Sequence, residues 1–245
     1  MYIALFFIFG LVLGSFFNVV GLRIPQKQSI VSPGSHCTTC KQPLKPIDLI
    51  PVLSYILSKG QCRYCHTKYA IIYPIIELST GLLFAFSYLQ FGWSPMLLLS
   101  LITVSLCMIV FVSDLNYMLI PDKIVLFFAP ILVVYRLWLP TDPWWDAWVG
   151  SMTGFGLLFL IAIVSKGGMG GGDIKLFALL GLIFGWKGTL LVLFLASLIG
   201  SVIGIALIVK QKVKRKQHVP FGPFIVLAAL LTLFWGESIL AWYFN

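Results

Sequence analysis

Long apolar segments separated by short polar ones run through most of this chain of 245 residues. A helix needs roughly 17 to 25 mainly apolar residues to cross the hydrocarbon core of a bilayer, and these runs lack the polar and apolar alternation of a barrel strand. The pattern therefore predicts an all-α polytopic membrane protein with about eight transmembrane helices. We expect them at residues 2–20, 71–90, 96–113, 124–139, 149–165, 174–185, 189–209 and 222–243.

Composition supports this interpretation. The chain is 60% hydrophobic and only 10% charged, with a mean hydropathy of +1.00, values outside the usual range of soluble domains. The first apolar run has no basic residue before it and is followed by Arg23 and Lys27. We expect an uncleaved first span rather than a removable signal peptide.

The distribution of basic residues predicts the orientation. The polar segment 21–70 contains one acidic residue, Asp48, and several basic ones: Arg23, Lys27, Lys41, Lys45, Lys59, Arg63 and Lys68. Cytoplasmic loops carry such an excess of Lys and Arg. Both termini are then expected outside, and the basic run Lys210 to Lys216 inside; only Arg136 and Lys187 break the pattern. We attribute the net charge of +9 to basic residues in cytoplasmic loops. We therefore expect membrane lipid, and not nucleic acid, as a partner.

The polar segment also contains four cysteines in two Cys-x-x-Cys pairs, Cys37 with Cys40 and Cys62 with Cys65. Two such pairs supply four thiolates for a structural Zn²⁺, leaving no open position for water. We expect a small zinc-bound cytoplasmic loop domain between the first and second spans. Two disulfides or unpaired thiols are the competing interpretations, but a reducing cytoplasm disfavours disulfides. The flanking histidines, His36 and His66, are alternative ligands.

Two aspartates, Asp114 and Asp173, lie at the edges of apolar runs in a chain with few other carboxylates. An ionisable group at such a place is a functional-site hypothesis by default. Two predicted spans separate them, so both are expected at the cytoplasmic boundary, on the side of the cysteine segment.

Two facing carboxylates hold one proton between them. One can take a proton from water while the other protonates the leaving group of a peptide bond. Gly170 and Gly172, with Gly167 and Gly168 just before them, suit a loop that a substrate backbone approaches closely.

Structural roles remain open for these carboxylates. Asp173 would instead cap a helix beginning at Ile174, and Asp114 would pair with Lys123 or Lys175. Asp122 is expected to cap the next span rather than to act in catalysis. Membrane-edge carboxylates also serve ion transport.

The motifs in this chain resemble those of the prepilin peptidases, also called type IV leader peptidases, which carry the aspartyl protease motif Gly-x-Gly-Asp. The family's second catalytic motif is similar to the segment Gly170-Gly171-Gly172-Asp173-Ile174-Lys175 of this chain. Its first catalytic motif is similar to Asp114 followed by Ile120-Pro121-Asp122. The cysteine-bearing domain of the family is similar to Gly14-Ser15-Phe16-Phe17-Asn18-Val19, Arg23-Ile24-Pro25, Pro33-Gly34-Ser35-His36-Cys37, Ile50-Pro51-Val52-Leu53-Ser54, Gly60-Gln61-Cys62-Arg63-Tyr64-Cys65 and Tyr73-Pro74-Ile75-Ile76-Glu77.

The resemblance implies two activities in a bacterial cytoplasmic membrane. A protease with Asp114 and Asp173 as its dyad, and Gly170, Gly172 and Lys175 in its catalytic loop, would remove the basic leader of prepilins or pseudopilins. An N-methyltransferase would then methylate the new N-terminal residue with S-adenosylmethionine.

The resemblance also implies two domains, a cysteine-bearing domain over residues 1–90, associated with methyl transfer, and a peptidase domain over 96–245. The candidates for the methyl-donor site are Asn18, Arg23 and Glu77. Each has a structural alternative: an interhelical hydrogen bond, a topology anchor and a partner for a loop lysine, respectively. Two other classes stay open, a proton- or cation-coupled transporter using the same aspartates and a membrane-anchored zinc module without catalysis.

Overall fold

The computed structural model describes residues 1–166, 168–209 and 220–244. Over these residues the chain is helical, with isolated β-bridges but no strand, which confirms the all-α prediction. Gly167 and the basic run Lys210 to Lys216 lie outside the described residues.

Contacts along the chain divide it into two compact units, Met1–Val112 and Ser113–Asn245. Unit 1 contains α1 (Tyr2–Arg23), the short helices η1 (Pro46–Leu49) and α2 (Leu53–Leu57), α3 (Ile72–Phe91) and most of α4 (Pro95–Tyr117). Unit 2 contains the end of α4, then α5 (Asp122–Trp138), α6 (Asp146–Val164), α7 (Gly171–Val209) and α8 (Gly222–Phe244).

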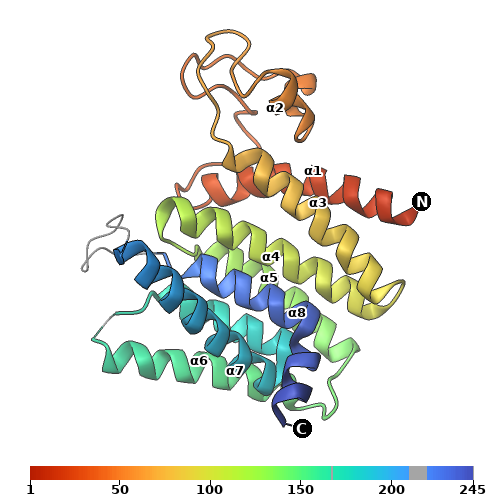
Figure 1. The fold of residues 1–245 in the computed structure, drawn as a ribbon, viewed down its shortest axis with the longest axis vertical. Coiled ribbons are helices and arrows are strands. Elements are labelled where there is room, and N and C mark those ends of the chain that lie inside the picture. The colour runs from red at the N-terminus through yellow and green to blue at the C-terminus, as the bar shows by residue number, and fades with distance from the viewer. Residues whose placement is uncertain (167, 210–219, 245) are drawn as a thin grey trace. The chain divides into compact units, whose positions relative to one another are not determined.

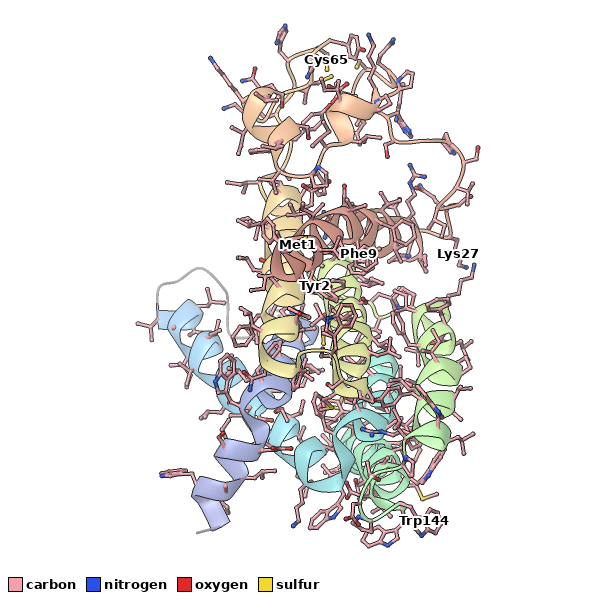
Figure 2. The ribbon with its side chains drawn as sticks, turned by 90° about the vertical axis from the view of Figure 1, so that its right-hand side faces the viewer. Met1, Tyr2, Phe9, Lys27, Cys65 and Trp144 are labelled. Atoms are coloured by element: carbon pink, nitrogen blue, oxygen red, sulfur yellow. The ribbon has the colours of Figure 1, made fainter. Side chains whose placement is uncertain are left out.

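In unit 1, α1 packs against α3 (Figure 1), and glycines lie at their contact. A Cβ atom on Gly10 would lie 2.7 Å from the carbonyl oxygen of Thr80, and one on Gly14 would lie 2.8 Å from the Cα of Glu77. Glycine at these positions lets two helix backbones approach closely, as small residues do between membrane helices. The polar segment between α1 and α3 extends away from them, with Cys65 near its outer end (Figure 2).

In unit 2, α7 is the central helix and packs against α5, α6 and α8. Gly150 of α6 and Gly181 of α7 approach so closely that a methyl group on either would overlap the backbone of the other helix. Close approach of this kind again depends on small residues.

The helix α7 is interrupted at Gly185, where φ is +66° and ψ −176°. The interruption leaves backbone groups without helical partners, and two charged side chains satisfy some of them. Arg136 of α5 donates to the carbonyl oxygens of Leu182 and Ile183 before the break. Asp146, in the first turn of α6, accepts the N–H of Trp186 after it, at 3.4 Å. A cation at a helix C-terminus and an anion at an N-terminus also favour the helix dipoles.

Six helices among the described residues are long and apolar enough to cross a membrane: α1, α3, α4, α6, α7 and α8. The polytopic prediction is confirmed, but its count of eight spans is not. The predicted span 124–139 corresponds to α5, which has 17 residues. The two predicted spans 174–185 and 189–209 form the interrupted helix α7.

Replacing Gly185 by alanine is expected to destabilise unit 2. The added methyl group would collide with the Asp146 carboxylate, and the backbone conformation is one that only glycine adopts without a cost of about 1–3 kcal/mol. Thermal unfolding in detergent should show a clear loss of stability. The control is Gly204→Ala, whose methyl group would enter open space on the same helix; equal stability of the two variants would contradict this account of the break.

Candidate active site and metal centre

The end of α4 is tied to the loop that follows it. The helix continues past Asp114 to Tyr117, so Asp114 lies inside α4 rather than after it. The N–H of Met118, at φ +51°, donates to the carbonyl oxygen of Asp114 at 2.8 Å. The hydroxyl of Ser113 donates to the carbonyl oxygen of Leu119. These bonds turn the chain sharply just before Ile120, which is buried.

The Asp114 side chain is only 5% exposed, and its carboxylate lies at the beginning of α8. The N–H of Gly222 donates to Oδ2 of Asp114 at 2.7 Å. A Cβ atom on Gly222 would lie 2.6 Å from the same oxygen, so only glycine permits this contact. Helix N-termini stabilise anions through free N–H groups and the helix dipole.

Asp173 lies in the first turn of α7, which begins at Gly171. The N–H of Asp173 donates to the carbonyl oxygen of Gly170, and Oδ2 lies against that glycine. Gly172 faces the turn after α4, since a Cβ atom there would lie 2.8 Å from the Cβ of Ile120. Because Gly172 has no side chain, the start of α7 can approach the end of α4 closely.

This approach brings the two carboxylates together. Asp114 and Asp173 lie close enough to interact electrostatically, although more than fifty residues of sequence separate them. Each lies near a helix N-terminus, Asp114 at that of α8 and Asp173 at that of α7. Two neighbouring carboxylates can share a proton and act as acid and base on one substrate.

Several structural alternatives for the acidic residues are wrong. The helix expected to begin at Ile174 begins at Gly171, so Asp173 is not its cap. Lys175 pairs with Asp122 at 2.7 Å rather than with Asp114. Asp122 does not cap α5 as expected, because Pro121 is the capping residue and makes no side-chain bond.

The four cysteines form one cluster in unit 1, whose sulfur atoms all lie within 4.8 Å of one another. The two Cys-x-x-Cys loops have the same hydrogen bonding: the N–H of Cys37 donates to the carbonyl of Gln42, and that of Cys62 donates to the carbonyl of Thr67. A β-bridge closes each loop, between His36 and Pro43 and between Gln61 and Lys68. Two similar loops thus present their sulfur atoms to a common centre.

The sulfur distances fit a metal site better than disulfides. Sγ of Cys37 lies 3.7 Å from Sγ of Cys65, and Sγ of Cys40 lies 4.0 Å from Sγ of Cys62. Metal–sulfur bonds of ~2.3 Å in a tetrahedral site place sulfur atoms roughly 3.8 Å apart, whereas bonded disulfide sulfurs lie ~2.05 Å apart. All five cysteines are free thiols. The histidines beside the loops are not part of the cluster.

The surroundings of the thiols change their pKa values in ways that bear on cation binding. The pKa of Cys62 is lowered to about 6 by backbone N–H groups of the same loop, chiefly that of Cys65. The pKa of Cys37 is also lowered, chiefly by the N–H of Cys40. The N–H of Gln42 also lowers the pKa of Cys40, but burial and the neighbouring sulfurs outweigh it and raise the pKa to about 11. A divalent ion would offset this crowding of negative charge, so the donor set suits metal binding.

The three candidates for the methyl-donor site make backbone contacts in unit 1. Asn18 donates from Nδ2 to the carbonyl oxygen of Tyr73 at 3.2 Å, which confirms its role as an interhelical donor. Glu77 accepts the N–H of Val52 at 2.7 Å, not a loop lysine.

Arg23 bonds to the loop that follows α1, whereas Asn18 and Glu77 bond to other elements. Its guanidinium donates to the carbonyl oxygens of Ser29, Pro33 and Gly34 and fastens the loop after α1. Asn18 and Glu77 remain on the packed faces of α1 and α3.

Gly222 was not predicted from the sequence. The one available signal is the pair Gly222-Pro223 at the start of an apolar run, which is typical of a helix beginning. That signal does not show which side chain the helix N-terminus faces.

Comparison with known protein families gives two matches. The bacterial peptidase A24 N-terminal domain matches residues 8–91, and the type IV leader peptidase family matches residues 101–205. The first match contains the cysteine cluster, and the second contains both aspartates.

Relatives match over nearly the full length. A prepilin leader peptidase/N-methyltransferase of Bacillus subtilis (strain 168) is 41% identical over 241 residues, covering 98% of this chain and 97% of the relative. Proteins of the same name from Aeromonas salmonicida (strain A449) and Neisseria gonorrhoeae are 33% and 30% identical, covering 100% and 95% of this chain and 94% and 90% of theirs. No solved structure matches the chain.

Metal removal is expected to loosen the cysteine segment. Because this segment buries little apolar side chain, the metal would supply much of its folding free energy. Chelation should make residues 35–69 sensitive to limited proteolysis, with cleavage sites identified by mass spectrometry.

Cys62→Ser should give the same sensitivity without chelator. Cys107→Ser, which changes a buried cysteine of α4 outside the cluster, is the control and should leave the segment resistant. Unchanged resistance after complete metal removal would contradict a structural metal.

Proposed function

Since this chain belongs to the type IV leader peptidase family, we propose that it removes the leader of prepilins or pseudopilins and then methylates the new N-terminal residue. The electrostatic interaction between Asp114 and Asp173 carries the proposal. The relatives' names favour this function over a transporter that would use the same aspartates.

In the proposed cleavage, the two carboxylates share one proton. The charged member takes a proton from the attacking water, and the other protonates the leaving amine of the scissile peptide bond. The Gly222 N–H holds Asp114 in one orientation. Gly170 and Gly172 let the Asp173 carboxylate and Ile120 lie close to the backbone at the start of α7. Lys175 lies within α7 rather than in a loop, and its ion pair with Asp122 links the start of α7 to the start of α5.

We further propose that the active site and the cysteine segment face the cytoplasm of a bacterial cell. The excess of basic residues in segment 21–70 supports this orientation. A membrane-borne substrate with an apolar helix would then present its leader at the level of the two aspartates. Membrane lipid surrounds the apolar helices, and nucleic acid is not expected as a partner.

Metal binding and methyl transfer belong to the N-terminal part, which we propose to be a domain of residues 1–90 beside a peptidase domain of residues 96–245. Zn²⁺ suits the four thiolates and would hold the cysteine segment together rather than react. S-adenosylmethionine would supply the methyl group. Asn18, Arg23 and Glu77 are the proposed polar residues of the methyl-transfer site, with Arg23 acting through the loop it fastens.

Replacement of either aspartate by asparagine should abolish cleavage. Acid–base catalysis contributes about 100- to 10,000-fold to a rate, so Asp114→Asn and Asp173→Asn should each slow leader removal by at least about 100-fold. The assay follows the mobility shift of a purified prepilin. Glu237→Gln, an exposed carboxylate of α8, is the control. Cleavage at the normal rate by either aspartate variant would rule out the dyad.

A methyl group on Gly222 should displace Asp114. The new Cβ atom would lie 2.6 Å from Oδ2, so Gly222→Ala should lower the cleavage rate by about 10-fold or more, equivalent to ~1.4 kcal/mol or more of transition-state free energy. Gly156→Ala, whose methyl group meets open space on α6, should cleave normally. If both variants behave alike, Gly222 does not position the dyad.

A further inference from the structure

The packed faces of α1 and α3 contain a buried amide oxygen without a partner. Asn18 is 6% exposed, and its Nδ2 is satisfied by the carbonyl of Tyr73. Its Oδ1 makes no hydrogen bond. An unsatisfied buried acceptor costs about 1–3 kcal/mol, so this oxygen is suited to a donor that arrives with a ligand.

A carboxylate lies along the same seam. Gly14 packs against the Cα of Glu77, and one helical turn further Asn18 contacts Tyr73, so Asn18 and Glu77 are about one turn apart. The Glu77 carboxylate accepts the N–H of Val52 and interacts with the Ser15 side chain. No ion pair of Glu77 occurs within the described residues.

The Asn18 amide oxygen and the Glu77 carboxylate together indicate which kind of cation would bind. Within α1, α3 and residues 95–112 of α4, the charged side chains are Arg23 and Glu77 alone, and Arg23 is bonded to loop carbonyls. A ligand that suits Glu77 is therefore positive, and one that suits Oδ1 of Asn18 must donate a hydrogen bond. A primary ammonium meets both requirements. The sulfonium centre of the methyl donor has no N–H and meets only the first, whereas the ammonium group of the donor's own amino acid meets both, so the KM for the donor separates the two ligands.

We propose that Asn18 and Glu77 bind the α-ammonium group of the cleaved substrate, and that Glu77 is the base that prepares it for methylation. This inference rests on the proposed function. The Glu77 carboxylate takes one ammonium proton, which leaves a lone pair on the amine nitrogen. That pair forms the bond to the methyl carbon of the sulfonium donor, and the carbon–sulfur bond breaks with its electrons passing to sulfur. The methylated amine is left positively charged, and its added charge balances the charge lost by sulfur.

The test uses the full-length protein in nanodiscs, labelled S-adenosylmethionine and a synthetic peptide that begins at the residue exposed by cleavage. Glu77→Gln still accepts the Val52 N–H but cannot take a proton. At pH 7 it should methylate at least about 100-fold more slowly, with the KM for the donor unchanged. The defect should shrink above about pH 9, where the amine, of ordinary pKa ~7.7–8.0, loses its proton unaided.

Asn18→Leu should raise the KM for the peptide and leave that for the donor unchanged. Thr80→Val is the matched control: Thr80 lies one turn from Glu77 on α3, and its hydroxyl is satisfied by the carbonyl of Ile76. It should methylate normally. Leader cleavage by the same samples reports the integrity of the fold.

Each remaining outcome has one meaning. Glu77→Gln methylating like the original protein at every pH would overturn the inference alone, as would a rise in donor KM, which would make this a donor site. Loss of cleavage together with methylation in Glu77→Gln would show a structural role and also overturn it. If the unsubstituted protein neither cleaves prepilin nor methylates the peptide, that result would overturn the proposed function itself.

Discussion

Backbone groups at helix ends need partners, and in a membrane protein water cannot supply them within the hydrocarbon region. The few charged side chains of this chain meet that need repeatedly. Asp114 accepts the first N–H of α8, and Asp146 accepts an N–H after the break in α7. Arg136 donates to carbonyls before the same break, and Glu77 accepts an N–H of the polar segment. Each bond joins two elements that are distant in sequence, so the charges link separate elements within each unit.

The candidate active site follows from this constraint in unit 2. Asp114 is held by α8, and Asp173 is carried by the first turn of α7. Their separation depends on two close approaches that only glycine allows, Gly222 against Asp114 and Gly172 against Ile120. The glycines are therefore part of the dyad's geometry even though they carry no reactive group. The N–H of Gly222 then holds one carboxylate in a fixed orientation at the place where acid and base are needed.

The cysteine segment of unit 1 is stabilised in another way. It has no helix longer than α2, and its order comes from two similar Cys-x-x-Cys loops that bring four sulfur atoms together. Bonds from Arg23 and Glu77 attach the segment to α1 and α3. The cysteine cluster and the proposed amine site are consequently parts of one assembly, since Glu77 both accepts the Val52 N–H and lies about one helical turn from Asn18.

The sequence alone determined the helical membrane architecture, the cysteine cluster and the two aspartates, because each depends on local properties: apolar run length, thiol spacing and the rarity of carboxylates. Tertiary structure decided what those residues contact. Hydropathy placed a polar gap between two short spans but did not reveal a helix broken at Gly185 and satisfied from α5 and α6. Nor did it reveal that Gly222 would face Asp114. Such partners come from distant segments, and only the packing of helix backbones against one another brings them within hydrogen-bond distance.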